Sequence, residues 1–261
     1  MPEPTPDARY TDAEKFLYGG QWYENSELAR LPEQLGGVRV FIDVGASLGP
    51  YTLCADQALK DADIYAIEAN PQTFKRLSEL CAESKSTNRL HPVHTAVSSE
   101  AGQIDFFIPT IKSSRLPLTS SLFQNQAVTD DWEKVSVACV TLDEFCRELS
   151  PDFIKMDIEG AEYRALLGAE RILREGRCRF LVEVHPWGDP DLGKRPEDVF
   201  KLFHSHGYDF RRLARHWLFT KSPGGGLLRW VKLQAITLIM RCLPLKQLLK
   251  KIVLWRDARR G

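Results

Sequence analysis

The sequence predicts an α/β fold in which a doubly wound, mostly parallel sheet carries helices on both faces. Short apolar runs typical of buried strands alternate along the chain with helical segments of roughly 10–15 residues. Glycines and carboxylates fall where the first of these runs end, as at Asp43-Val-Gly45 and Glu68. The chain has 261 residues, 43% of them hydrophobic and 27% charged, which is enough for one sizeable core.

The expected elements follow one another in a regular order. Apolar or alternating runs predict strands over Val38–Val44, Asp63–Glu68, Leu90–Val97, Gln103–Pro109, Glu133–Val140, Phe153–Asp157, Arg179–His185, Asp209–Leu213 and Trp217–Thr220. Helical periodicity predicts helices over Asp12–Leu31, Tyr51–Leu59, Asn70–Glu83, Thr141–Leu149, Ala161–Leu173 and Pro196–His206. Residues 110–131 have no clear period and predict a long loop. We therefore expect a loosely ordered N-terminus over residues 1–11, one domain over 12–221, and a basic helical appendage over 222–261.

The first strand-turn-helix unit predicts a nucleoside-binding site. In doubly wound sheets ligands bind beyond the carboxyl ends of the strands, where the strand order reverses. Gly45 and Gly49 follow the first strand and allow a tight turn and a close approach to a ligand. Glu68 ends the second strand, where a half-exposed carboxylate can accept hydrogen bonds from a ribose diol. The glycine spacing lacks the Gly-x-Gly-x-x-Gly pattern of dinucleotide sites, so it favours S-adenosyl-L-methionine, a nucleoside without phosphate, over NAD.

Several motifs together resemble the FkbM-type family of S-adenosylmethionine-dependent methyltransferases. They are Asp43–Thr52, Ile67–Pro71, Thr141–Glu144, Asp152–Glu162 and Val182–His185, in this order along the chain. The resemblance implies a class I methyltransferase (Rossmann-like) fold and O-methylation of a hydroxyl on a sugar, glycan or polyketide-like acceptor. The cofactor-binding residues expected on this basis are Asp43, Gly45, Ala46, Gly49, Glu68 and Asn70. Ser47 and Ala69 depart from the family's common asparagine and proline without removing a glycine or the carboxylate.

Four polar residues near the ends of the predicted strands Phe153–Asp157 and Arg179–His185 are candidates for catalysis. Asp157 and Glu159 follow one strand, and Glu183 and His185 lie on the next. We select Asp157, Glu159 and His185 as the catalytic residues. His185 could act as a general base, or the carboxylates with His185 could hold a divalent metal that lowers the pKa of the acceptor hydroxyl. Asp157 could instead orient the cofactor, Glu183 could bond to a neighbouring loop, and Glu162, inside the expected helix, is predicted to lie at the surface.

The C-terminal segment differs in charge from the rest of the chain. Residues 224–261 hold nine basic residues and one acidic residue, Asp257, although the whole chain has a formal net charge of zero. Leu245, Leu248 and Ile252 form a helical apolar stripe, which predicts either peripheral contact with an anionic membrane or packing on the domain or on a second subunit. Nucleic-acid binding is not expected, because large aliphatic residues separate the basic ones.

The remaining features concern compartment and rival functions. Six scattered cysteines without a Cys-x-x-Cys pair argue against a disulfide framework and a structural zinc site. Together with the lack of a signal peptide and of a spanning segment, they predict a cytoplasmic protein, or one at the inner membrane surface. Two rivals stay open: a catalytically silent methyltransferase-like module acting through its tail, and a nicotinamide-dependent oxidoreductase. The acceptor, metal dependence and oligomeric state do not follow from the sequence.

Overall fold

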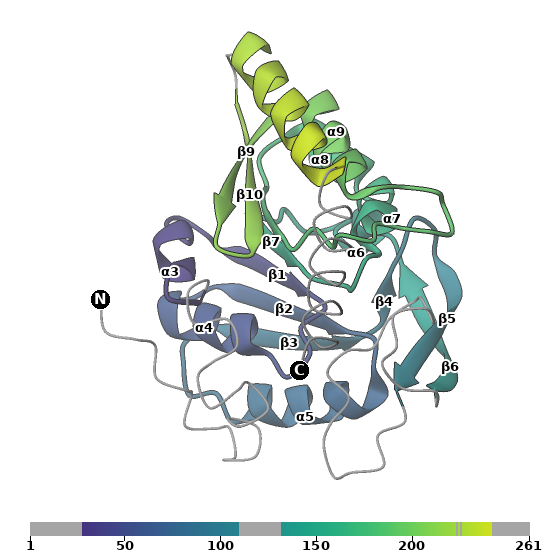
Figure 1. Cartoon of the computed structure of the whole chain (residues 1–261). Helices are drawn as coiled ribbons and strands as arrows, with labels where there is room; N and C mark the ends of the chain where they lie inside the picture. The colour runs from purple at the N-terminus through teal and green to yellow at the C-terminus, as the bar shows by residue number, and fades with distance from the viewer. Residues whose placement is uncertain (1–27, 110–131, 223, 225, 242–261) are drawn as a thin grey trace, which may run out of the picture.

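A computed structural model describes residues 28–109, 132–222, 224 and 226–241 (Figure 1). Its centre is a seven-stranded sheet in the order β3-β2-β1-β7-β8-β10-β9. The bounds are β1 (Val40–Val44), β2 (Asp63–Glu68), β3 (Arg89–His94), β7 (Phe153–Met156), β8 (Arg179–Val182), β9 (Tyr208–Leu213) and β10 (His216–Lys221). The predicted class, a mostly parallel α/β sheet, is confirmed.

The sheet reverses its order between β1 and β7. β1 pairs in parallel with β2 on one side, Val44 lying opposite Ile67, and with β7 on the other, Val44 lying opposite Met156. Only β10, next to the edge strand β9, runs in the opposite direction, because it pairs antiparallel with both β8 and β9. The carboxyl ends of β1, β2 and β7 therefore meet at the point where a doubly wound sheet binds its ligands.

The central strands β1, β7 and β8 bury both faces, since successive side chains of a strand point to opposite sides of the sheet and both sides are covered here. Phe41 packs in one cluster with α3 (Leu31–Gln34) and α4 (Pro50–Ala58), while its neighbour Ile42 packs in the cluster on the opposite face. α5 (Pro71–Ala82) contacts Ala66 on the same face as α4.

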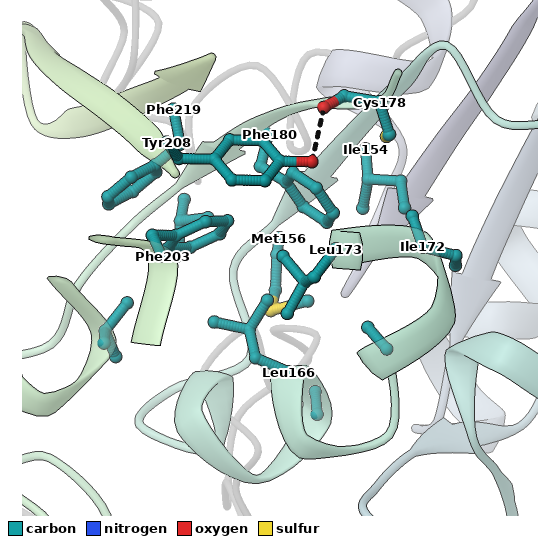
Figure 2. Packing of buried hydrophobic residues seen from close by; sticks show 14 of the residues in the cluster. Ile154, Met156, Leu166, Ile172, Leu173, Cys178, Phe180, Phe203, Tyr208 and Phe219 are labelled. Carbon is teal, nitrogen blue, oxygen red and sulfur yellow. Dashed lines mark hydrogen bonds between the residues drawn. The ribbon is translucent and has the colours of Figure 1, made fainter. Parts of the chain in front are cut away.

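The opposite face carries α6 (Leu142–Phe145), α7 (Glu162–Leu167), α8 (Glu170–Glu175) and α9 (Pro196–Ser205). Figure 2 shows part of this larger core, where the Tyr208 hydroxyl donates to the carbonyl of Cys178 over 3.1 Å. A helix over residues 226–241 also contributes Leu233, Ile236 and Met240 to it. In the part of the chain that the structure describes, no helix has the length and apolar character needed to cross a membrane.

A second, three-stranded sheet was not expected. It has the order β4-β6-β5, with β4 (Ala96–Val97), β5 (Gly102–Pro109) and β6 (Trp132–Val140). The single strand predicted over Leu90–Val97 is wrong, because β3 pairs with β2 whereas Ala96 and Val97 pair with β6. The two halves differ in their partner strands, which the sequence does not show.

The single helix predicted over Ala161–Leu173 is also wrong. It divides into α7 and α8 around Gly168, whose Cα lies against the carbonyl oxygen of Ser98 and the side chain of Thr141. The helix expected after Thr141 ends at Phe145, although the Thr141 side chain accepts from the backbone of Glu144 as the capping pattern predicts. The predicted loop over residues 110–131 and most of the predicted helix over Asp12–Leu31 lie outside the described residues.

Candidate active site

An open pocket lies at the carboxyl ends of β1, β2 and β7. It is lined by Val44, Gly45, Ser47, Ile67, Glu68, Ala69, Thr73, Thr95, Ala96, Val97, Phe106, Asp157, Ile158, Glu159 and Ala161. Two of the six expected cofactor residues and two of the three expected catalytic residues are among them. Phe106 comes from the second sheet, so that sheet forms one wall of the pocket.

The turn after β1 depends on a glycine at position 45. Gly45 has a φ of +75°, and a Cβ there would overlap the backbone carbonyl of Asp157. The amides of Gly45 and Ala46 both donate to the carbonyl of Ile67, at 3.0 and 2.9 Å. Because glycine has no side chain, the loops after β1 and β7 can approach each other closely at position 45, on the floor of the pocket.

Asp43 does not line the pocket. It is fully buried, accepts a hydrogen bond of 2.7 Å from the Thr52 hydroxyl, and lies 3.2 Å from the Lys155 ammonium. Lys155 also donates to the Gly45 carbonyl over 3.1 Å. The buried pair of Asp43 and Lys155 therefore stabilises the backbone of the turn at Gly45. The sequence interpretation missed Lys155, a charged residue inside an otherwise apolar strand.

Glu68 lines the pocket at the end of β2, but it is not half exposed as expected. Only 7% of its surface is accessible. Its two carboxylate oxygens accept from the amides of Ser47 and Asn70, each at 2.7 Å. Burial raises its pKa above the ordinary value, against these hydrogen bonds. The carboxylate also interacts with the Thr73 side chain, and it has acceptor capacity left for a ligand hydroxyl.

The other three expected cofactor residues support the pocket from outside its lining. Ala46 is buried under the turn. Gly49, at a φ of +82°, precedes α4 where a Cβ would meet the side chain of Leu77. Asn70 is the N-cap of α5, its side chain accepting from the amide of Gln72 at 2.9 Å.

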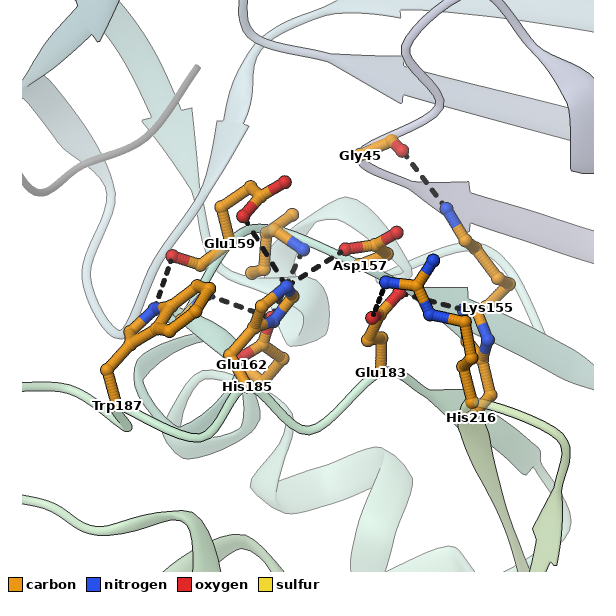
Figure 3. A network of polar contacts seen from close by, with 12 residues as sticks. Gly45, Lys155, Asp157, Glu159, Glu162, Glu183, His185, Trp187 and His216 are labelled. Carbon is orange, nitrogen blue, oxygen red and sulfur yellow. Dashed lines mark hydrogen bonds and ion pairs between the residues drawn. The ribbon is translucent and has the colours of Figure 1, made fainter. Parts of the chain in front are cut away.

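The structure brings Asp157, Glu159 and His185 together (Figure 3). Nε2 of His185 lies 3.4 Å from a carboxylate oxygen of Glu159 and 3.8 Å from one of Asp157. Both carboxylates keep part of their surface accessible, 19% for Asp157 and 28% for Glu159. Asp157 and Glu159 form a polar wall of the pocket, and His185 is buried behind them.

Glu162, predicted to lie at the surface, is 2% exposed, so that expectation is wrong. One of its oxygens accepts from Nδ1 of His185 at 2.8 Å and from the amides of Ile158 and Gly160 at 3.2 and 3.1 Å. The helix is shorter than expected and begins at Glu162, so this side chain points back into the preceding loop. Glu162 thereby directs Nε2 of His185 toward Asp157 and Glu159.

The concentration of carboxylates shifts several pKa values. Burial acts to lower the pKa of His185, but Glu162, Asp157 and Glu159 outweigh it and raise the pKa to about 10. Burial raises the pKa of Glu159 to about 7, against the attraction of His185. Burial also acts to raise the pKa of Asp157, but Lys155 and His185 hold that pKa below its ordinary value. Shifts of this kind are typical of functional sites.

A second histidine, His216 at the start of β10, lies beside the same cluster. It is fully buried, and neither ring nitrogen has a hydrogen-bond partner among the described residues. Its Nε2 lies 3.8 Å from Glu183, whose other oxygen accepts from Arg215 at 3.1 Å. Burial lowers the pKa of His216 to about 3, so its imidazole is neutral near pH 7. Glu183 is thus paired with Arg215, the residue directly before β10.

Two sets of side chains in this cluster have the spacing of metal ligands, and Asp157 belongs to both. One set adds Glu159 and His185, and the other adds Glu183 and His216, with one ligand atom per residue lying within 4.8 Å of the others. The first set is the one that the sequence interpretation named. Its histidine is oriented by a buried carboxylate, an arrangement common around metal-bound imidazoles.

Comparison with known proteins gives a consistent result. A family model described as the methyltransferase FkbM domain matches residues 43–210. The hexuronic acid methyltransferase AglP of Haloferax volcanii is 27% identical over 164 residues, 62% of this chain and 60% of that protein. The methyltransferase sdnD of Sordaria araneosa is 26% identical over 216 residues, 73% of this chain and 80% of that protein. Among solved structures, methyltransferase FkbM from Methylobacillus flagellatus has a TM-score of 0.46 and 17% identity, over 70% of this chain and 43% of that one.

Proposed function

Because the chain belongs to the FkbM family of methyltransferases, we propose that it transfers a methyl group from S-adenosyl-L-methionine to a hydroxyl of a sugar, glycan or polyketide-like acceptor. The observation that carries this proposal is the pocket at the reversal of the sheet. Its floor holds Gly45 and Glu68, and one wall holds Asp157 and Glu159. The family assignment favours methyl transfer over the nicotinamide-dependent alternative.

The residues present fit this cofactor. Glu68 is fixed by two backbone amides and keeps lone pairs for a ribose diol. Val97, Phe106 and Ile158 supply apolar surface for a nucleobase. When bound, S-adenosyl-L-methionine supplies a methyl group on a positively charged sulfur. Asp157 and Glu159 place negative charge on the wall that such a cation would face.

Asp157, Glu159 and His185 receive the acceptor in this proposal. In-line methyl transfer depends chiefly on holding the attacking oxygen and the methyl carbon at near-attack distance. As the oxygen–carbon bond forms and the carbon–sulfur bond breaks, the hydroxyl proton leaves the acceptor. A carboxylate of the cluster accepts that proton, because the raised pKa of His185 keeps its imidazole protonated near pH 7. Alternatively, a divalent cation held by the three residues would lower the pKa of the hydroxyl beforehand.

Chelation distinguishes these two roles of the cluster. Turnover that disappears with EDTA and returns with Mn²⁺ or Mg²⁺ supports the cation. Turnover that survives exhaustive chelation assigns the proton to a side chain. In both cases Asp157→Asn and His185→Ala are expected to lower kcat more than they weaken cofactor binding, because these residues act on the transition state.

The cofactor assignment is tested by calorimetry on Glu68 variants. Glu68→Ala should weaken S-adenosyl-L-methionine binding by at least about tenfold, since hydrogen bonds to a charged group are worth about 1.5–3 kcal/mol each. Glu68→Gln, which preserves shape and one acceptor oxygen, should fall between Glu68→Ala and the wild type. NAD serves as the control ligand and should not bind.

An unchanged dissociation constant in folded Glu68→Ala would remove Glu68 from the cofactor site. Because Glu68 also holds the amides of Ser47 and Asn70, the thermal midpoint of each variant must accompany the titration. The acceptor class is tested separately, by a mass gain of one methyl group in a screen of hexuronic acids, neutral sugars and polyketides. Binding of S-adenosyl-L-methionine with no methylated product would favour the catalytically silent alternative.

A further inference from the structure

Three polar residues lie in one row across neighbouring strands, at the edge of the sheet that carries the pocket. β7, β8 and β10 are adjacent in the sheet. Val182 of β8 pairs with the residue before Asp157 in β7 and with the residue after His216 in β10. One step further along each strand therefore places Asp157, Glu183 and His216 side by side (Figure 3). Side chains at paired positions point to the same face of a sheet, so these three converge.

The distances between the three side chains are those of ligands around one cation. One oxygen or nitrogen atom of each residue lies within 4.8 Å of the other two. Nε2 of His216 lies 3.8 Å from Oε2 of Glu183. Bonds of about 2.0–2.2 Å from a metal ion to nitrogen and oxygen place two ligand atoms of one ion about 3–4 Å apart. Small side-chain movements are therefore enough to close this row around an ion.

His216 is the residue whose surroundings point to a ligand. Its side chain is fully buried, and neither ring nitrogen has a hydrogen-bond partner among the described residues. A buried polar group without a partner is costly, because it has given up its hydrogen bonds to water. The 3.8 Å to Glu183 is too long for a hydrogen bond. A cation between the imidazole and the two carboxylates would bind the nitrogen lone pair and both negative groups at once.

The basic side chains beside the row have carboxylate partners of their own. Arg215 donates to Oε1 of Glu183 at 3.1 Å, which leaves Oε2 as the oxygen nearer to His216. The ammonium of Lys155 lies 3.2 Å from the buried carboxylate of Asp43. Arg215 thus orients a ligand carboxylate, as hydrogen-bonded neighbours of metal ligands commonly do.

The other set of possible ligands, Asp157 with Glu159 and His185, is less suited to a cation. Nδ1 of His185 lies 2.8 Å from Glu162, and Nε2 lies 3.4 Å from Glu159. Both ring nitrogens of His185 therefore face a carboxylate already. A cation bound there would replace an existing ion pair, whereas a cation at His216 would bind a nitrogen that has no partner among the described residues.

We propose that Asp157, Glu183 and His216 bind a divalent transition-metal ion. One imidazole nitrogen with carboxylate oxygens suits ions such as Mn²⁺, Fe²⁺ or Zn²⁺, whereas Mg²⁺ and Ca²⁺ prefer oxygen ligands alone. Asp157 also lines the pocket, so the remaining coordination positions of the ion are open to water or to a substrate oxygen on that side. The site stands on this geometry alone, and only its use in activating the acceptor hydroxyl rests on the proposed function.

The test is titration of the full chain with Mn²⁺ after removal of metals by chelation, without S-adenosyl-L-methionine or acceptor. Electron paramagnetic resonance of the free ion should show one Mn²⁺ bound per chain. Glu183→Gln removes a ligand charge at nearly constant shape and should weaken binding at least about tenfold. Glu159→Gln is the matched control, because it makes the same change in the other set, and it should weaken binding much less.

His216→Phe gives an independent readout, since it keeps an aromatic ring and removes both ring nitrogens. These nitrogens have no partner among the described residues, so the metal-free variant should be at least as stable as the wild type. Added Mn²⁺ should raise the thermal midpoint of the wild type but not that of His216→Phe. Spin-echo spectroscopy of Mn²⁺ bound to the wild type should show a directly coordinated nitrogen.

Three results would overturn the proposal. The wild type might bind no Mn²⁺, Glu159→Gln might weaken binding as much as Glu183→Gln, or folded His216→Phe might retain the affinity of the wild type. Each of these results is separate from the proposed function, because the screen for a methylated product measures methyl transfer independently. A chain that binds Mn²⁺ through His216 but yields no methylated product would keep the metal site and reject the acceptor class.

Discussion

At the scale of single residues, the candidate site concentrates buried charge and backbone strain. Ser47 and Glu159 both line the pocket, and both have a left-handed φ, +52° and +53°. This conformation costs a non-glycine residue about 1–2 kcal/mol. Strain of this kind persists where function requires a particular side-chain direction. At Glu159 it points the carboxylate toward Nε2 of His185.

Replacing Glu159 by glycine separates this strain from the role of the carboxylate. Glu159→Gly relieves the strained conformation but adds chain entropy in the unfolded state, so the free energy of unfolding should stay within about 1 kcal/mol of the wild type. Methyl transfer should fall on the order of 100-fold or more, as for Glu159→Gln, which keeps the strain. Chemical denaturation and steady-state kinetics measure the two effects. Full activity in Glu159→Gly would exclude a catalytic role for this carboxylate.

We predict that the Glu162 carboxylate keeps His185 protonated by raising its pKa, and the variant Glu162→Gln tests this prediction. Removing this charge should lower the pKa of His185 from about 10 toward its ordinary value, which an NMR titration of the imidazole would report. The pKa is raised in the folded state, so the stabilisation from the imidazolium is complete below the unfolded-state pKa near 6.5. It is lost as pH rises through about 10.

The free energy of unfolding of Glu162→Gln should therefore no longer show the fall between about pH 6.5 and 10 that the titration of His185 causes in the wild type. The exposed pair Glu175–Arg177 supplies the control: Glu175→Gln should leave the pKa of His185 unchanged. If Glu162→Gln also leaves it unchanged, the carboxylates of Asp157 and Glu159 alone account for the raised pKa.

At the scale of elements, the pocket exists because two loops of neighbouring strands pass very close to each other. Gly45 is the first residue after β1, and a Cβ on it would overlap the backbone carbonyl oxygen of Asp157, the first residue after β7. The two strands are adjacent in the sheet but lie more than 100 residues apart in the sequence. Sequence spacing predicted the need for glycine. The contact that imposes this need is a property of the folded sheet.

Gly45→Ala should destabilise the protein and weaken cofactor binding together. The left-handed conformation costs alanine about 1–2 kcal/mol, and the overlap with the Asp157 carbonyl adds to this cost. Gly37→Ala is a matched control, because Gly37 has nearly the same φ of +76° but no atom near the added Cβ. The difference between the two variants in unfolding free energy and in S-adenosyl-L-methionine affinity isolates the overlap. Equal effects would show that the close approach is not essential to the site.

At the scale of the whole molecule, the described part of the C-terminal segment belongs to the domain. Leu233, Ile236 and Met240 share a core with α6, α7, α8 and α9. For residues 222–261 the sequence left open contact with a membrane, packing on the domain or packing on a second subunit, and the described part of the segment packs on the domain. Truncation after Ser222 would open the larger core, because it removes all three of these side chains.

Substitutions on the two sides of this helix should have opposite consequences. Leu233→Ala should lower the free energy of unfolding by about 2–5 kcal/mol, since it removes a side chain that is only 8% exposed. Leu228→Ala, at 62% exposure on the outer side of the helix, should change it by no more than about 0.5 kcal/mol. Thermal and denaturant unfolding of the full chain measure both. A small effect of Leu233→Ala would mean that the helix contributes little to the core.

The sequence by itself determined the order and type of most elements and the end of the sheet at which the pocket lies. Apolar periodicity predicted β2 at its observed bounds, and the glycine and carboxylate positions predicted Gly45 and Glu68 in the pocket. It also selected Asp157, Glu159 and His185, which lie together at the pocket. These predictions rest on local patterns, which a single stretch of chain contains in full.

Only the tertiary structure decided which polar side chains face the pocket and which support it. Asp43 belongs to a buried pair with Lys155, and Glu162 turns inward to His185, although nothing in their local sequence distinguishes them from pocket or surface residues. Likewise the second sheet and the inner side of the C-terminal helix depend on contacts between distant segments. A charged side chain acquires its role from partners brought to it by folding, because burial and pairing, not residue type, set its energy and its pKa.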